Sequence, residues 1–355
     1  MNISITERLK PFSHTYGINC LIPGTQWKVK AFPTYWAFKN IETLKEFTVD
    51  IEIPGPYQEF TCLQDLEKGK VTIFFQSQKG YFRFDIMGFS EGIELIFVKG
   101  TPEGVSIITK KNEQKIYPKD RILLTSSEEK MGSFSSEFER LSLGSSKKQD
   151  WDLMMRRKDL REIFPIWLKA ASSTSNKQHP FSHPVLDQCK RLIHERRTHE
   201  LYDAFSLLFQ LSFEGMMCPT IEDKNHLKVF DKPLAPISAF EVMQKGAELI
   251  RSLFFQQKED HLYILPNLPS KMICGRFIKI YSEDIGVIDL EWSKGKIKKF
   301  ILHACSNKTI HLHFQKEIRE YRLKQKLSDK GTIIHSKEAL SIRSGNTYIL
   351  DRFQK

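Results

Sequence analysis

The stretch His261–Ile280, HLYILPNLPSKMICGRFIKI, decides how the chain is organised, because a strand-like run meets two prolines before a second strand-like run begins. HLYI and RFIKI both show the alternation of a half-buried β-strand. Proline lacks a backbone N–H and forces the residue before it out of the right-handed helical region. Leu265–Pro269 is therefore predicted to form a rigid extended corner where the chain turns from a helical layer into a sheet.

Downstream of the corner, residues 258–355 are predicted to form a basic β-sandwich module. Short runs of period two continue to the end of the sequence, among them GVIDLEW, KIKKFILH, TIHLHF and TYILD. Trp292–Lys296 is expected to be a hairpin turn in which Gly295 adopts a positive φ. Lys and Arg outnumber Asp and Glu by 19 to 11 over residues 257–355, so this module carries +8 of the net charge of +11.

Upstream, residues 131–257 are predicted to be helical, with a loop at residues 170–184. SAFEVMQKGAELIRSLFF has an apolar stripe and a capping box formed by Ser238 and Glu241. A second helix is expected to begin at Pro184 and to be exposed or interrupted over residues 194–200, which are polar on every side. Pro165 is expected to end or kink a third helix, QDWDLMMRRKDLREIF.

Residues 1–130 are predicted to form an N-terminal antiparallel β module. Eight short β-like runs between Trp27 and Ser126 are separated by breakers such as PGP at residues 54–56 and KG at residues 79–80. This alternation of runs and breakers is typical of hairpins in a β-sandwich. The sequence thus predicts an α+β protein in which two β-sandwich-like modules flank a short helical region.

Composition places the chain among globular proteins, with 40% hydrophobic and 27% charged residues. The six cysteines are scattered without a C-x-x-C pair, which favours buried thiols in a reducing cytoplasm over a disulfide framework. The opening residues MNISITERLKPF lack the apolar run of a signal peptide, and no stretch approaches the length of a membrane span. We therefore expect a cytoplasmic protein with no membrane partner.

Three elements around the proline corner carry a resemblance to a known family. The helix Phe240–Phe254, the strand Ile264–Pro269 and the hairpin LEWSKGKI at residues 290–297 follow one another in this order. Together they resemble the passage from the last helix of the catalytic barrel into the C-terminal β domain of family-95 glycoside hydrolases, the α-L-fucosidase group. The resemblance covers residues 237–303 and implies a saccharide ligand. Of the family's glycine-rich, arginine-containing segment after the corner, this sequence keeps only Gly275, Arg276 and Gly286.

The (α/α)6 catalytic barrel of such enzymes does not fit in this chain. Twelve helices of about eleven residues each need well over 150 residues with their loops, whereas about 110 residues lie between the β modules. No catalytic residue is therefore carried over from the family. The sequence predicts a reduced relative that binds or hydrolyses a saccharide, and whether it is an enzyme stays open at this point.

If the protein is a glycoside hydrolase, its two carboxyl groups are expected in the loop SFEGMMCPTIEDKNH. Such catalysis needs one protonated and one ionised carboxyl group. Glu214 and Asp223 are the candidates, with His226 binding substrate and orienting one of them. Ordinary solvated turns have the same composition, so a purely structural loop is the favoured alternative. Trp292, beside its hairpin turn, is the candidate for an exposed platform that stacks on a sugar ring, whereas Trp151 and Trp167 are expected in the core.

A second hypothesis is a non-enzymatic binding or scaffold protein whose basic C-terminal module contacts a polyanion or a protein partner. Basic runs at residues 156–158, 190–191, 196–197 and 294–299 support it. No recognised nucleic-acid-binding pattern accompanies them, so nucleic acid is the less favoured partner. His311 and His313 share one face of a strand without further ligands at metal spacing, and no glycine-rich phosphate loop occurs. Neither a metal nor a cofactor is predicted, and the sequence does not indicate the oligomeric state.

Overall fold

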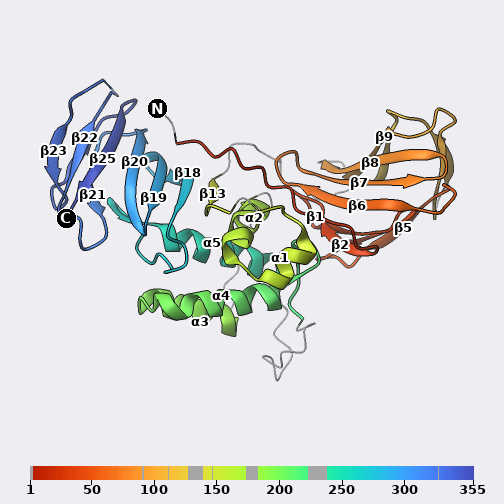
Figure 1. The fold of residues 1–355 in the computed structure, drawn as a ribbon, viewed down its shortest axis with the longest axis horizontal. Coiled ribbons are helices and arrows are strands. Elements are labelled where there is room, and N and C mark those ends of the chain that lie inside the picture. Colours follow the sequence, from red (N-terminus) through yellow and green to blue (C-terminus); the bar gives the residue numbers. More distant parts are fainter. Residues whose placement is uncertain are drawn as a thin grey trace.

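The computed structural model describes residues 3–89, 92–110, 112–126, 139–145, 147–172, 183–222, 238–326 and 328–355. Three parts lie in a row, with a β-rich module at each end and helices between them (Figure 1). The predicted α+β fold, with two β-sandwich-like modules flanking a short helical region, is confirmed.

Two six-stranded sheets make up the N-terminal module. The first has the strand order β1 (Phe12–Ser13), β6 (Gln58–Asp65), β7 (Lys70–Ser77), β8 (Gly80–Phe89), β9 (Gly92–Lys99) and β12 (Arg121–Ser126). The second has the order β11 (Glu113–Ile116), β10 (Val105–Thr109), β5 (Glu46–Ile51), β4 (Tyr35–Asn40), β3 (Trp27–Ala31) and β2 (Ile18–Leu21). Aromatic rings from alternate positions fill the core, and Trp36 of β4 meets Phe84 of β8 edge to face at 5.2 Å between centroids.

The C-terminal module combines a seven-stranded and a four-stranded sheet. The larger sheet has the order β13 (Arg140–Ser142), β18 (Gly275–Ser282), β19 (Gly286–Ser293), β20 (Lys296–Ala304), β25 (Thr347–Gln354), β22 (Glu320–Lys324) and β23 (Thr332–His335). The smaller has the order β16 (Phe255–Lys258), β17 (His261–Ile264), β21 (Lys308–His313) and β24 (Leu340–Ile342). β13 comes from the segment expected to be helical, so this segment contributes an edge strand to the C-terminal sheet.

Five helices in the described part of the chain form the middle layer: α1 (Trp151–Arg157), α2 (Leu160–Ser172), α3 (Pro184–His194), α4 (Thr198–Ser212) and α5 (Ala239–Phe254). A two-stranded ribbon, β14 (Phe213–Glu214) and β15 (Cys218–Pro219), follows α4. The predicted start at Pro184 and the interruption within residues 194–200 are confirmed by the ends of α3 and α4. None of the helices in these described segments combines the length and the hydrophobicity needed to cross a bilayer.

Two local predictions about the helices are wrong. α2 continues through Pro165, and the break lies earlier, at Lys158, which takes a left-handed conformation with φ 50° and ends α1. Pro165 is the sixth residue of α2, past the first turn, so α2 continues although Pro165 has no N–H to donate to the carbonyl oxygen of Arg161. The capping box does not form either, because the Ser238 hydroxyl donates to Glu42 of the N-terminal module instead of capping α5.

The proline corner differs from its prediction in place and in conformation. The chain already leaves α5 at Phe255, so the corner joins β17 of the small sheet to β18 of the large one. Leu265 has φ 52°, which is left-handed instead of extended. Its N–H donates to the carbonyl oxygen of Phe254 at 2.8 Å, and the N–H of Asn267 donates to that of Leu253 at 3.3 Å. The corner is therefore fixed on the end of α5.

The first residues of the chain form an N-terminal strap, residues 3–11, that runs from the C-terminal module across the helices to the N-terminal module (Figure 1). Ile3 and Ile5 pack on the C-terminal sheet against Ile278, Ile301 and Ile349. The carbonyl oxygen of Ser4 accepts from Arg276 at 3.0 Å. At the other end, the Lys10 ammonium pairs with Asp65 of β6 at 2.7 Å. One continuous segment thus ties the two β modules together.

Candidate functional site

Glu214, the first predicted catalytic carboxylate, lies at the junction of the helical region and the N-terminal module. Its carboxylate forms a short ion pair with Lys28 of β3, and both side chains are largely buried. The following residues pair with β2, since the N–H of Met216 donates to the carbonyl oxygen of Asn19 at 2.7 Å. Asp223 and His226 lie outside the described residues. The structure therefore gives Glu214 a role in joining two parts of the molecule.

The expectation that Trp292 forms an exposed platform is wrong. Its side chain is 1% exposed, its ring stacks on Phe254 at 5.3 Å, and its indole N–H donates to the carbonyl oxygen of Met272 at 3.0 Å. The position beside a turn misled the prediction, whereas the alternation of β19 places Trp292 on the inner face with Ile288 and Leu290. Trp151 and Trp167 are buried, as expected.

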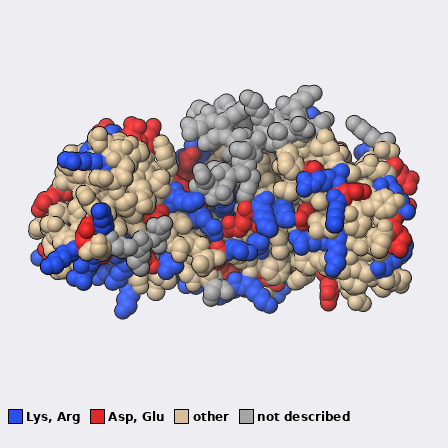
Figure 2. Space-filling view, turned by 90° about the horizontal axis from the view of Figure 1, so that it is seen from above, with Lys and Arg blue, Asp and Glu red and all other residues tan. Residues whose placement is uncertain are grey.

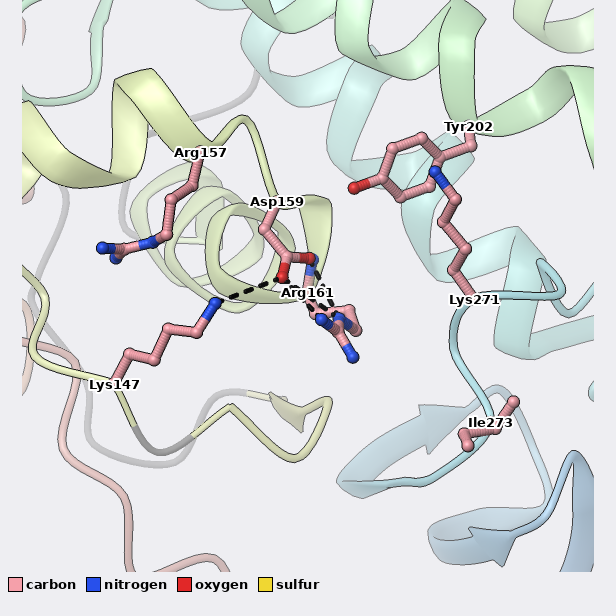
Figure 3. Close-up of a pocket in the computed structure, with 7 residues that line it drawn as sticks. All are labelled: Lys147, Arg157, Asp159, Arg161, Tyr202, Lys271 and Ile273. Carbon is pink, nitrogen blue, oxygen red and sulfur yellow. Dashed lines mark hydrogen bonds and ion pairs between the residues drawn. The ribbon is translucent and has the colours of Figure 1, made fainter.

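A pocket of about 510 Å³ lies where the helical region meets the C-terminal module (Figure 3). Figure 2 shows Lys and Arg side chains spread over one face of the molecule, on the β-rich ends and between them. Seven residues from five segments line the pocket: Lys147, Arg157, Asp159, Arg161, Tyr202, Lys271 and Ile273. Four of the seven are basic and one is acidic, so the pocket is positively charged.

The break between α1 and α2 positions the helical side of the pocket. The left-handed residue Lys158 separates Arg157 from Asp159 and redirects the chain. Tyr202 of α4 fixes this junction from across the pocket, because its hydroxyl accepts from the N–H of Leu160 at 3.2 Å and donates to the carbonyl oxygen of Lys158 at 3.3 Å. Burial raises the pKa of Tyr202, so the hydroxyl keeps its proton.

Asp159 is the only carboxylate among the lining residues, and it holds two of the cations. Its oxygens accept from Arg161 at distances from 2.7 to 3.2 Å, and Lys147 lies 3.9 Å away (Figure 3). Burial acts to raise the pKa of Asp159, but the hydrogen bonds and charge of Arg161 and the charge of Lys147 outweigh burial and lower it. Arg157 instead binds Glu162 behind the pocket, and this pairing raises the pKa of the guanidinium.

The opposite wall comes from Lys271 and Ile273, in the segment that follows the proline corner. The ammonium of Lys271 lies 3.9 Å from the centroid of the Tyr202 ring, a cation–π contact that spans the pocket (Figure 3). Ile273 is 54% exposed and gives this wall an apolar surface. Lys271 and Ile273 both lie in the stretch His261–Ile280, but the sequence pattern did not identify them as site residues.

The arrangement is suited to binding an anion. Lys and Arg side chains with exposed ends donate several hydrogen bonds to a carboxylate, phosphate or sulfate group. Asp159 and Tyr202 also line the pocket, and both are held in place by hydrogen bonds within the helical region. Within the described segments, no three His, Cys, Asp or Glu side chains are arranged to hold a metal ion. Of the basic run at residues 156–158, Arg157 lines the pocket, while the sequence analysis did not single out Asp159, Arg161 or Tyr202.

A second cluster of polar rings lies on the small sheet. Parallel pairing of β17 with β21 sets His261 opposite His311 and Tyr263 opposite His313. The rings stack in the order His311, His261, His313, Tyr263, with centroid distances of 4.7, 5.1 and 4.5 Å. Nδ1 of His261 and Nε2 of His313 are 2.8 Å apart, which makes a hydrogen bond only if one of the two is unprotonated.

This ring column should make stability depend on pH. Burial, together with the charges of His261 and His311, lowers the pKa of His313 from its usual 6.5. The unfolded chain therefore binds a proton more readily than the folded chain, so stability should fall as the pH drops below 6.5 and level off below the folded pKa. Lys258, 5.8 Å from the Tyr263 ring, adds a further positive charge.

Urea unfolding at pH 7.5 and 5.5 measures the effect. Wild type should lose more stability on acidification than His313→Gln, which lacks the titrating ring. His199→Gln, on an exposed position of α4, is the control and should behave as wild type. Equal losses in wild type and His313→Gln would contradict the assignment.

Comparison with protein-family models and with curated proteins gives no match for this chain.

Proposed function

We propose that the protein binds an anionic saccharide in the basic pocket and does not hydrolyse it. The observation that carries this proposal is the convergence of Lys147, Arg157, Arg161 and Lys271 on one pocket. Several cations at a concave site raise the local concentration of anions and hold an acidic group by charge-assisted hydrogen bonds. The pocket volume of about 510 Å³ is in the range of sites for small organic ligands.

The choice of a saccharide has two supports. Residues 237–303, the stretch that resembles family-95 glycoside hydrolases, include Lys271 and Ile273 of the pocket. The pocket also mixes cations with an acceptor carboxylate and an apolar side chain, which suits a ligand that carries hydroxyl groups and C–H surface besides its acidic group.

Binding is better supported than hydrolysis. A glycoside hydrolase needs one carboxyl group that keeps its proton at working pH. The pKa of Asp159 is lowered, because Arg161 and Lys147 outweigh its burial. Glu162, behind the pocket, is bound by Arg157 and by Lys147, the latter at 3.2 Å. The pairing of Glu214 with Asp223 stays a prediction.

All six cysteines are free thiols, in keeping with the predicted cytoplasmic location, although Cys274 and Cys305 are exposed instead of buried.

Calorimetric titration at low ionic strength tests the proposal, with glucuronate as the acidic sugar and glucose as its neutral counterpart. Glucuronate should bind and glucose should not. Lys271→Ala should weaken glucuronate binding about tenfold or more, since a hydrogen bond to a charged group contributes about 1.5–3 kcal/mol. Lys190→Ala, an exposed lysine on α3 outside the pocket, is the matched control. Equal affinity for both sugars, or equal effects of the two substitutions, would refute the assignment of this pocket.

A further inference from the structure

We infer that the ligand is a chain with several acidic groups, and that a second acidic group binds Lys294 and Lys298 on the β19–β20 hairpin beside the pocket. This inference rests on the proposed function, because it extends the ligand of the same pocket. Lys294 and Lys298 form this second subsite, the hairpin subsite. The ligand would then belong to the class of acidic oligosaccharides.

The hairpin is fixed against the pocket wall. The N–H of Gly295 donates to the carbonyl oxygen of Ile273 at 2.7 Å, so the turn touches a residue that lines the pocket. One residue away, the indole of Trp292 donates to the carbonyl oxygen of Met272 at 3.0 Å. Gln315 holds the turn from behind, since its amide donates to the carbonyl oxygen of Gly295 and accepts from the N–H of Ile297. A ligand chain that leaves the pocket past Ile273 would therefore contact the β19–β20 hairpin, whose turn is held in place by these hydrogen bonds.

The cations of this hairpin are available to a ligand. Lys294 and Gly295 both have positive φ, at 53° and 71°, as in a tight two-residue hairpin turn, and the Lys294 side chain is exposed. Lys298 is the extra residue of a β-bulge, because Glu291 pairs with Lys299 and Trp292 with Ile297. Its side chain is exposed as well. Neither Lys294 nor Lys298 has an ion-pair partner in the segments that the structure describes, whereas Lys296 pairs with Glu317 at 2.8 Å.

A saccharide chain fits this track better than a single-stranded nucleic acid. Proteins that bind single strands stack bases on exposed aromatic rings. In the pocket, the Tyr202 ring carries the Lys271 ammonium on one face. On the large sheet, the exposed aromatic residue is Tyr281 of β18. It lies six residues, or about 20 Å, along the strand from Gly275, which pairs with Trp292 at the hairpin. A site that offers cations but no free aromatic ring for stacking suits an acidic saccharide chain better than a nucleic acid.

The test is a titration with galacturonate oligomers of one to six residues, with neutral cello-oligosaccharides of equal length and single-stranded oligothymidylate as comparisons. Affinity for galacturonate should rise at least tenfold from monomer to tetramer, because the second contact becomes intramolecular. Lys294→Ala/Lys298→Ala should remove this gain and leave the monomer affinity unchanged. Lys330→Ala/Lys337→Ala, two exposed lysines in the β22–β24 region, removes the same charge and should leave the gain intact.

The outcomes separate this inference from the proposed function. If the monomer binds through Lys271 but length brings no gain, or the hairpin substitutions leave the gain intact, the hairpin subsite is refuted and the pocket assignment stands. If no galacturonate binds at any length, both fail. Tighter binding of oligothymidylate than of galacturonate of equal charge would overturn the saccharide class in favour of a nucleic acid.

Discussion

Trp292→Ala is expected to lower the free energy of unfolding by about 3–5 kcal/mol, the cost of truncating a buried tryptophan. Its ring is 1% exposed, stacks on Phe254 at the end of α5 and bonds to Met272 in the proline corner. The substitution therefore removes contacts among three elements at once. Chemical denaturation followed by circular dichroism measures the change, and a loss below about 1 kcal/mol would show that the site collapses around the cavity.

Trp292→Phe distinguishes the contribution of ring packing to stability from that of the indole hydrogen bond. Phenylalanine retains most of the packing but leaves the buried carbonyl oxygen of Met272 without its donor, at a cost of about 1–3 kcal/mol. Lys271 and Ile273 flank Met272, so this variant should also weaken glucuronate binding in the proposed pocket. Normal binding by a destabilised Trp292→Phe would limit Trp292 to a purely structural role.

Gly246→Leu is expected to destabilise the helical layer by about 3 kcal/mol through overpacking. A Cβ atom at Gly246 would lie 2.2 Å from Cζ2 of Trp167. The Trp167 ring cannot withdraw, because its indole N–H donates to the carbonyl oxygen of Met243 at 2.7 Å and its ring packs edge to face on Phe213 at 4.6 Å. The better helix propensity of leucine, worth under about 1 kcal/mol, is too small to offset this contact.

Chemical denaturation of three further variants isolates the cause. Glu248→Leu, two residues along α5 and exposed, is the matched control and should change stability little. Trp167→Phe removes the indole carbons that a Cβ at Gly246 would meet, so the double variant Gly246→Leu/Trp167→Phe should be more stable than the sum of the single effects. Strict additivity would place the strain elsewhere.

Strands with a clear period of two were predictable from sequence because burial on one face needs only local alternation. YFRFDIM corresponds to β8, and the two runs around Gly295 correspond to β19 and β20 with the expected turn. β13 and β2, of three and four residues, are too short to show a period. The path of α2 through Pro165 was not predictable, because proline inside a helix normally ends or kinks it and the packing that buries Ile163 to Ala171 of α2 is not visible in the local sequence.

The candidate site was less predictable, because it consists of single residues from separate segments. Lys147, Tyr202 and Lys271 come together only when a loop, a helix and the corner pack against one another. In each segment the local pattern indicates no more than an exposed or amphipathic position. The wrong prediction for Trp292 has a different origin. The alternation of β19 correctly indicates that Trp292 is buried, but the prediction of an exposed ring was based on its position beside the turn.

The N-terminal strap constrains the order in which the protein can mature during synthesis. Ile3 lies in one cluster with Ile278, Ile301 and Ile349, and Ile349 belongs to β25, so the strap is synthesised well before the last of its partners. The ribosome adds about 5–20 residues per second, and domains fold as they emerge. The N-terminal sandwich can close while the rest of the chain is still being translated, but the strap can dock on the C-terminal sheet only after β25 is released. Until then Ile3 and Ile5 lack one of the isoleucine side chains that they pack against in the folded protein.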